Sequence, residues 1–291
     1  MLEHLGIILR GFLMGMAEVV PGVSGGTIAL VTGIYERLVA ALASFSPQSI
    51  VMLRDPRAFF AHHDLGFLLV LVLGMALGVL SLAQGVNYLL DKYPSPLWAF
   101  FFGLILATAV GLGRERQHKK LLTFGLLGAV AGGLMLQMPE MSESTSALGF
   151  FFAGVVAICA WILPAVSGSY LLVVLGYYRA VLDAIENLDF TVILIFGAGC
   201  ATGLMLFVRL LKYLLARHYE ALLSFLCGFM LLSALKLWPW QIEGETGLGA
   251  LVLPVEFSSR TQSDPMLMLS IVSAIVGMIF YVALRRLDVR A

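Results

Sequence analysis

The sequence predicts an all-α polytopic membrane protein built from two inverted-topology repeats, each with a re-entrant helix hairpin and about three transmembrane helices. Of the 291 residues, 60% are hydrophobic and only 12% are charged, whereas soluble domains carry about 25% charged residues. Long apolar stretches recur along the chain, and two related helix-breaking motifs interrupt them at matching places. The interior of a chain of this length cannot bury so many apolar side chains, so lipid must cover the remainder.

Six apolar segments are long enough, or nearly so, to cross a ~30 Å hydrocarbon core. They are 65–90, 97–113, 121–138, 190–215, 221–238 and 266–284. Two further stretches, 5–45 and 147–186, are interrupted by the motifs and by charged residues. The limbs 10–21 and 27–37 each cover roughly 15 Å, which is half of the core. We therefore expect 5–45 and 147–186 to be re-entrant hairpins, with two full, kinked spans in each stretch as the alternative.

The chain also repeats itself. An offset of 143 residues aligns Gly11 with Gly154, Pro21 with Pro164, Ser24-Gly25 with Ser167-Gly168, and Gly33 with Gly176. An offset of 125 then aligns Asp64 with Asp189, Gly74 with Gly199, Gly78 with Gly203, Phe100 with Phe225, and Gly103 with Gly228. The predicted repeats cover 1–140 and 146–291. Because each contains an odd number of crossings, the second is expected to be inverted relative to the first.

The distribution of positive charge predicts how the chain is oriented. With the hairpins in place, one membrane face collects all but four of the 18 Lys and Arg residues. The exceptions are Lys92, Arg179, Lys236 and Arg260. Since cytoplasmic loops are enriched in Lys and Arg, we expect both termini to lie in the cytoplasm.

The two motifs, 21–27 (PGVSGGT) and 164–170 (PAVSGSY), are the candidate binding site. A helix is expected to begin after each, near Thr27 and near Ser169, and its first N–H groups carry partial positive charge. Two such helix starts facing one midplane position would bind an anion. The candidate substrate-binding residues of the motifs are Ser24, Gly25, Gly26, Thr27, Ser167, Gly168 and Ser169. The alternative is that these small residues only allow close helix packing.

Three charged side chains complete the candidate set. Glu18 is the candidate ion-coupling residue, for H⁺ or Na⁺, because a carboxylate at membrane depth is costly and is retained for a function. Capping of the broken helix, or pairing with Arg10, is its alternative. Arg37 and Arg179 lie near opposite open ends of the hairpins and are candidate ligands of an anionic headgroup, although snorkelling anchors explain them equally well.

Other chemistry finds little support. The five histidines map to termini or loops, and the sequence contains neither a metal-ligand cluster nor a phosphate-binding loop motif. We therefore expect no catalytic residue, no metal, no cofactor beyond a coupling ion, and no nucleic-acid partner. The bilayer is the expected environment, and the oligomeric state is left open, a homodimer included.

Residues around both motifs resemble a known family. Residues 14–27 (MGMAEVVPGVSGGT), followed by 33–36 (GIYE), are similar to the first signature of the PopT-like polyprenyl-phosphate transporters. Residues 162–170 (ILPAVSGSY), with Gly176 and Tyr178 behind them, resemble the second. The chain departs mildly from the two signatures at two positions. Ala165 stands where Gly is expected, and Glu18 stands where Asp is common. The resemblance covers nearly the whole chain.

This resemblance implies a secondary transporter, or flippase, of the bacterial cytoplasmic (inner) membrane. Such a protein returns undecaprenyl phosphate from the outer to the cytoplasmic leaflet, and its partner is therefore a polyprenyl-phosphate lipid. Alternating access would hold the headgroup at the midplane between the two Ser-Gly tips. The residues alone leave open a carrier or channel for a small soluble anion and, less favoured, a membrane phosphatase acting on a lipid.

Overall fold

The computed structural model describes residues 2–20, 24–46, 49–139, 141, 146–164, 166–242 and 249–288. Pro21, Gly22, Val23 and Ala165 of the two motifs therefore lie outside the described residues. The chain divides into two compact units, the first made from residues 1–82 and 141–217 and the second from 83–140 and 218–290. Each unit thus combines segments from both halves of the sequence.

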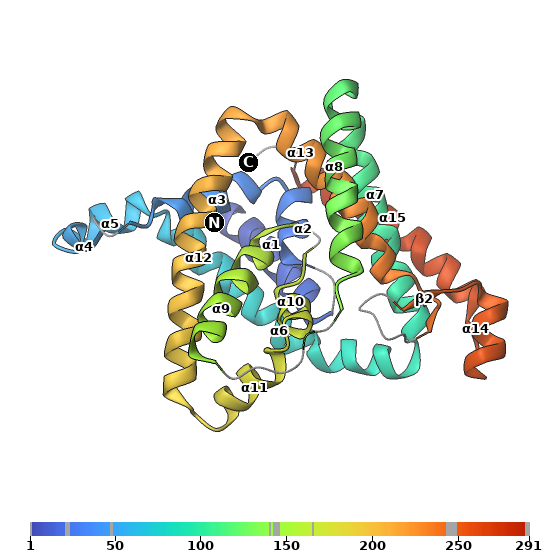
Figure 1. Cartoon of the computed structure of the whole chain (residues 1–291). Coiled ribbons are helices and arrows are strands. Elements are labelled where there is room, and N and C mark those ends of the chain that lie inside the picture. The colour runs from blue at the N-terminus through green and yellow to red at the C-terminus, as the bar shows by residue number, and fades with distance from the viewer. Residues whose placement is uncertain are drawn as a thin grey trace. The chain divides into compact units, whose positions relative to one another are not determined.

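The first unit is helical throughout its regular, described elements (Figure 1). Its helices are α1 (Leu2–Val19), α2 (Gly25–Val31), α3 (Tyr35–Ser44), α4 (Ser49–Met52), α5 (Pro56–His62), most of α6 (Leu65–Lys92), α9 (Ala147–Ile162), α10 (Gly168–Val174), α11 (Tyr178–Glu186) and α12 (Phe190–Arg217). Helix α9 packs along α12, and α3 also contacts α12. The short helices α4 and α5 lie between the interrupted stretch 5–45 and the apolar segment 65–90.

The second unit contains the remaining helices and a small hairpin. Its elements are the end of α6, α7 (Pro94–Arg114), α8 (His118–Leu136), α13 (Tyr219–Ser233), the 3₁₀ helix η1 (Ala234–Leu237), β1 (Gln241–Ile242), β2 (Ala250–Leu251), α14 (Pro254–Thr261) and α15 (Leu267–Asp288). Strands β1 and β2 pair antiparallel, with Gln241 opposite Leu251. Helix α8 packs against α13, and α7 packs against α15.

The described residues form six helices that are long and apolar enough to cross a membrane, or up to eight spans if each of two bent helix pairs is one span. The six are α6, α7, α8, α12, α13 with η1, and α15. They match the six segments predicted from hydropathy. The chain is therefore an all-α polytopic membrane protein.

The interrupted stretches are more broken than the sequence predicted. The helix expected to begin after each motif is instead bent, by 117° between α2 and α3 and by 110° between α10 and α11. Gly33 and Gly176 occupy these bends, and both have φ 73°. This left-handed conformation is accessible to glycine without the steric cost that a Cβ atom brings. The chain therefore turns sharply where the sequence suggested a continuous limb.

Close helix packing in the first unit depends on glycines. The glycine contacts between α1 and α6 have counterparts between α9 and α12. A methyl group at Gly11 would overlap the Leu71 carbonyl, and one at Gly154 would overlap that of Phe196. Likewise, Gly74 faces the Ile8 carbonyl and Gly199 faces that of Phe151. The contact of α1 with α6 is thus related to that of α9 with α12 by the offsets of 143 and 125 that relate the sequences.

The second unit reveals a further correspondence that sequence comparison missed. Gly103 of α7 packs on Ala274 and Gly277 packs on Phe100, while Gly228 of α13 packs on Gly125 and Gly128 packs on Phe225. Since α7 and α13 are related by an offset of 125, α8 and α15 correspond with an offset of 274 − 125 = 149. Each helix therefore packs against a partner from the other half of the chain.

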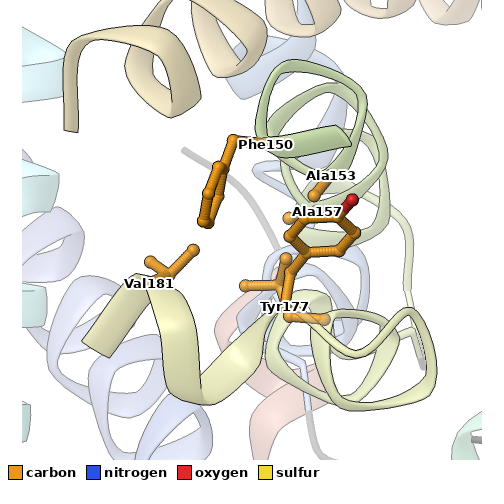
Figure 2. Close-up of a cluster of buried hydrophobic side chains, with 6 residues drawn as sticks. Phe150, Ala153, Ala157, Tyr177 and Val181 are labelled. Atoms are coloured by element: carbon orange, nitrogen blue, oxygen red, sulfur yellow. The ribbon is translucent and has the colours of Figure 1, made fainter. Parts of the chain in front are cut away.

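A small hydrophobic core holds the second interrupted stretch together (Figure 2). Phe150, Ala153 and Ala157 of α9 face Tyr177 and Val181 at the start of α11, and Leu172 of α10 joins them. The rings of Phe150 and Tyr177 pack edge to face, with centroids 5.2 Å apart. Five positions of the first stretch that lie 143 residues earlier are also buried, namely Ile7, Met14, Ala29, Ile34 and Leu38. Both stretches are thus packed modules of three helices.

Replacing Gly199 by Ala should destabilise the first unit, because the added methyl group would overlap the backbone of α9 at Phe151. Overpacking of this kind costs about 1–3 kcal/mol. Gly197→Ala is the matched control, since a Cβ atom there has nothing within 4 Å. Thermal unfolding of the purified protein in detergent should show a lower melting temperature for Gly199→Ala alone, and equal melting temperatures would contradict the packing described.

Candidate functional site

The first motif contacts the residues directly before the second motif, inside the first unit. The Ser24 hydroxyl donates a hydrogen bond of 3.2 Å to the Leu163 carbonyl, across 139 residues of sequence. Beside it, a Cβ atom on Gly26 would lie only 2.8 Å from the Ile162 carbonyl oxygen. The start of α2 is therefore in backbone contact with the end of α9, directly before the second motif.

At the first motif, α2 begins at Gly25, two residues before the predicted start at Thr27. Ser24 caps it in an extended conformation, and its hydroxyl accepts a 3.1 Å hydrogen bond from the Gly26 N–H. Such a cap satisfies one of the N–H groups that a helix start leaves free. Ser24 and Thr27 are 1% and 0% exposed. In this conformation both hydroxyls of the first motif are therefore enclosed by protein.

Glu18 caps the same helix from the preceding one. Its Oε1 accepts a 2.7 Å hydrogen bond from the Gly25 N–H. A Cβ atom on Gly25 would lie 2.8 Å from that oxygen and 3.3 Å from the Met14 carbonyl oxygen. The absence of a side chain at position 25 is thus what allows the carboxylate to reach the helix start. A charged acceptor at this place is favourable, because the N-terminus of a helix carries partial positive charge.

At the second motif, α10 begins at Gly168, one residue before the predicted start at Ser169. The Ser167 hydroxyl accepts a hydrogen bond from the Tyr170 N–H at 3.4 Å and lies 2.8 Å from the Ser169 hydroxyl. Ser167 is half-buried and Ser169 is exposed. This pair of hydroxyls is therefore open to an incoming ligand, in contrast to the enclosed hydroxyls of the first motif.

The two motifs share a backbone pattern, but the helix before each places a different side chain against its glycine. Gly168 packs against the Ala157 carbonyl and the Trp161 Cβ atom, just as Gly25 packs against Met14 and Glu18. An indole thus stands where the other motif has a carboxylate. The offset of 143 places Trp161 opposite Glu18. The sequence gives no indication of the Leu163 carbonyl, because a backbone acceptor carries no residue-type signature.

Arg37 is held at the open end of the first stretch by two carboxylates. Its Nε lies 2.7 Å from Asp64 Oδ2, and its NH1 lies 3.0 Å from Glu3 Oε1. The guanidinium also covers the Phe67 ring at 4.5 Å. Arg179, on α11, is exposed, and the ion pairs found among the described residues do not include it. The structure thus gathers Ser24, Gly25, Gly26 and Glu18 at the start of α2, beside the end of α9. Ser167, Gly168 and Ser169 form a second group at the start of α10. The hydrogen bonds of Arg37 go to neither group.

A histidine joins the end of α3 to the start of α6. His63 Nδ1 lies 2.6 Å from the Ser44 hydroxyl, which itself donates to the Ala41 carbonyl at 2.6 Å. Because that hydroxyl has a single hydrogen, the imidazole must be the donor. Burial lowers the pKa of His63, and the neighbouring His62 lowers it further. The ring stacks on Phe45, with centroids 4.3 Å apart, so it serves as a neutral packing element.

The similarity to known proteins is extensive. Residues 14–249 match the model of a family described as undecaprenyl phosphate translocase-like. The chain belongs to this family. A polyprenyl-phosphate transporter of Vibrio cholerae serotype O1 is 38% identical over 82% of this chain and 79% of its own length. A polyprenyl-phosphate transporter of Staphylococcus aureus is 29% identical over 80% of this chain and 85% of its own. No solved structure matches the chain.

Replacing Ser24 by Ala should destabilise the protein, because it removes both the cap of α2 and the hydrogen bond to Leu163. Losing a cap and a buried hydrogen bond together costs about 1–3 kcal/mol. Ser146→Ala is the control, since the exposed Ser146 caps only α9, through the Gly149 N–H. Thermal unfolding should show the larger decrease for Ser24→Ala, and a smaller decrease than for Ser146→Ala would contradict the role assigned to Ser24.

Proposed function

We propose that this protein transports undecaprenyl phosphate, returning it from the outer to the cytoplasmic leaflet of the bacterial inner membrane. Membership of the translocase-like family and two relatives named as polyprenyl-phosphate transporters support this proposal. The observation that carries it is that the serine-capped start of α2 bonds the end of α9 at Leu163, five residues before the serine-capped helix α10 begins, inside one packed unit. Helix starts with free N–H groups and hydroxyl donors suit a phosphate headgroup.

We infer that the chain has two inverted repeats, 1–140 and 146–291, with both termini in the cytoplasm. The corresponding glycine contacts of α1 with α6 and of α9 with α12 support this arrangement, as does the concentration of Lys and Arg on one predicted face. The interrupted stretches are re-entrant in this proposal. Helices α2 and α10 have seven residues each, so each rises only about 10 Å, a third of the hydrocarbon core.

The difference between the motifs suggests how the headgroup is handled. In this conformation the phosphate would be received by Ser167 and Ser169, whose hydroxyls are accessible. Access to Ser24 requires the hydrogen bond to Leu163 to break and Gly26 to separate from α9. Alternating access then follows as an exchange of partners, in which the headgroup replaces a protein group at one helix start and later at the other.

The two arginines have different roles in this proposal. Arg179 is exposed near the open end of the second stretch, so its charge is available to attract a lipid phosphate. The guanidinium of Arg37 is occupied by Asp64 and Glu3. These contacts favour an anchoring role for Arg37, and headgroup binding there would require the two ion pairs to be given up.

Ser167→Ala should weaken the binding of undecaprenyl phosphate by about tenfold or more, because a hydrogen bond to a charged group is worth about 1.5–3 kcal/mol. Ser146→Ala, which removes a serine cap far from the tips, should bind as the unchanged protein does. Native mass spectrometry with undecaprenyl phosphate, undecaprenol and inorganic phosphate measures both headgroup and lipid selectivity. Equal binding of the lipid phosphate and the alcohol would contradict the site, and a preference for inorganic phosphate would favour a carrier of small soluble anions.

Glu18→Gln should remove any dependence of transport on a proton or sodium gradient while leaving the protein folded. The amide oxygen can still accept from the Gly25 N–H, but an amide neither takes up a proton nor attracts a cation. Glu36→Gln, the same change on the exposed face of α3, is the control. Lipid transport by reconstituted vesicles under imposed gradients provides the measurement. If lipid transport by Glu18→Gln still depends on the imposed gradient, Glu18 only caps α2 and does not couple transport to an ion.

A further inference from the structure

The two bends of the first unit have the same backbone conformation, but the helices that follow them are held differently. Gly33 lies between α2 and α3, Gly176 lies between α10 and α11, and both have φ 73°. A glycine in this conformation can act as a hinge, because it has access to backbone angles that other residues avoid. The contacts of the helix beyond the bend then decide whether the hinge moves.

The start of α3 is held by an ion-pair network, the Arg37 clamp, which consists of Glu3, Arg37 and Asp64. Arg37 makes two hydrogen bonds to Asp64, from Nε to Oδ2 at 2.7 Å and from Nη2 to Oδ1 at 3.2 Å. A third, of 3.0 Å, goes to Glu3 Oε1. A bidentate pair within a network stabilises a structure more than a single exposed ion pair does. The clamp ties α3 to the start of α1 and to the residue directly before α6.

Corresponding aspartates make different contacts in the two halves of the chain. Both carboxylate oxygens of Asp64 accept hydrogen bonds from Arg37. Asp189 corresponds to Asp64 with the offset of 125. Its carboxylate instead caps α12, by accepting hydrogen bonds from the N–H groups of Thr191 and Val192 at 3.0 and 3.3 Å. The same residue type thus holds a neighbouring helix in one half and only its own helix start in the other.

The end of α3 is held as well. The Ser44 hydroxyl lies 2.6 Å from His63 Nδ1, and the His63 ring stacks on Phe45. Arg209 of α12 donates a hydrogen bond of 3.2 Å to the Phe45 carbonyl. A positive charge is favourable there, because the C-terminus of a helix carries partial negative charge. Polar contacts with other elements therefore fix α3 at both of its ends.

Helix α11 has no such clamp. With the offset of 143, Glu3 and Arg37 correspond to Ser146 and Ala180, which are uncharged. The Ser146 hydroxyl caps α9 through the Gly149 N–H. Among the described residues, the side chains of α11 form no hydrogen bond or ion pair with another helix. The corresponding helices therefore differ in every polar contact that fixes α3.

Apolar contacts hold α11 in place. Figure 2 shows Val181 of α11, and Tyr177 directly before it, beside Phe150 and Ala153 of α9. Hydrophobic contacts have no preferred direction, whereas hydrogen bonds and bidentate ion pairs have a defined geometry. A helix that is held by apolar contacts alone can pivot and keep much of its contact area, while α3 would have to give up its polar contacts at both ends.

We propose that α11 is the moving arm of this protein, hinged at Gly176, and that the Arg37 clamp fixes α3 as a stationary wall. Arg179 is exposed on the first turn of α11. Motion of the arm would therefore move its charge toward and away from the hydroxyl pair of Ser167 and Ser169. The role of this motion in transport rests on the proposed function, whereas the difference in mobility between α11 and α3 does not.

Spin labels at four corresponding positions test this difference. Ala40 on α3 and Leu69 on α6 form the clamped pair, and Asp183 on α11 and Leu194 on α12 form the arm pair. The offsets of 143 and 125 relate the two pairs, and all four residues are exposed. Each is replaced by Cys in the full-length protein after its three native cysteines have been changed to Ala. Double electron–electron resonance then measures the distances between the labels of each pair.

The arm pair should show two distance populations and the clamped pair a single one. Undecaprenyl phosphate should shift the balance between the two populations of the arm pair, as expected of a ligand that prefers one conformation. Arg37→Gln should add a second population to the clamped pair, because it removes the ion pairs. Arg57→Gln is the matched control and should change neither pair, since Arg57 is exposed on α5 and the ion pairs among the described residues do not include it.

Ala180→Arg transfers the clamp to the second stretch. It places a guanidinium at the position that corresponds to Arg37, while Asp189 already stands at that of Asp64. This variant should reduce the arm pair to one population and slow lipid transport about fivefold, the effect that one exposed ion pair can have. Ala180→Gln, which adds bulk without charge, should retain two populations.

A single population of the arm pair with and without lipid, or two populations of both pairs in the unchanged protein, would overturn the inference. So would a clamped pair that Arg37→Gln leaves unchanged, or equal effects of Ala180→Arg and Ala180→Gln. Undecaprenol separates this inference from the proposed headgroup site. If the arm pair shows two populations but the lipid phosphate shifts them no more than the alcohol does, the moving arm stands and the headgroup site fails.

Discussion

Every backbone N–H and carbonyl group in a bilayer must find its partner within the protein, and the rest of this structure depends on how that requirement is met at two broken helices. Helix α1 ends at Val19 and α2 begins at Gly25, while α9 ends at Ile162 and α10 begins at Gly168. The start of each new helix has N–H groups without a partner in its own helix. Glu18 and Ser24 satisfy those of α2, and Ser167 satisfies one at α10. The Ser24 hydroxyl then bonds the Leu163 carbonyl, so one break helps to satisfy the other.

The same groups explain why such a structure suits an anion carrier. A hydroxyl or carboxylate that caps a helix start occupies the position that a phosphate oxygen would take. A site of this kind carries no fixed positive charge, so it remains stable within the membrane when it is empty. In the proposed function, close approach of the backbones at Gly25, Gly26 and Gly168 would make the exchange geometrically feasible.

The two halves of the chain make corresponding helix contacts, so the positions at which the halves differ stand out. Glu18 stands opposite Trp161, and the enclosed Ser24 stands opposite the accessible Ser167. The long connection from η1 to α15, residues 238–266, has the short connection 115–117 between α7 and α8 as its counterpart. The proposed return of a lipid from one leaflet to the other would use such differences, because two identical halves would treat both faces of the membrane alike.

The amino-acid sequence by itself determined the membrane class, the six spans and the positions of both helix breaks within two residues, because hydropathy and proline or glycine punctuation act locally. It also identified the offsets of 143 and 125 that relate the glycine contacts. Only the tertiary structure located the bends at Gly33 and Gly176, the offset of 149 between α8 and α15, and the Leu163 acceptor. These features depend on which backbone lies opposite which, and contacts between distant segments leave no signature in a single stretch of sequence.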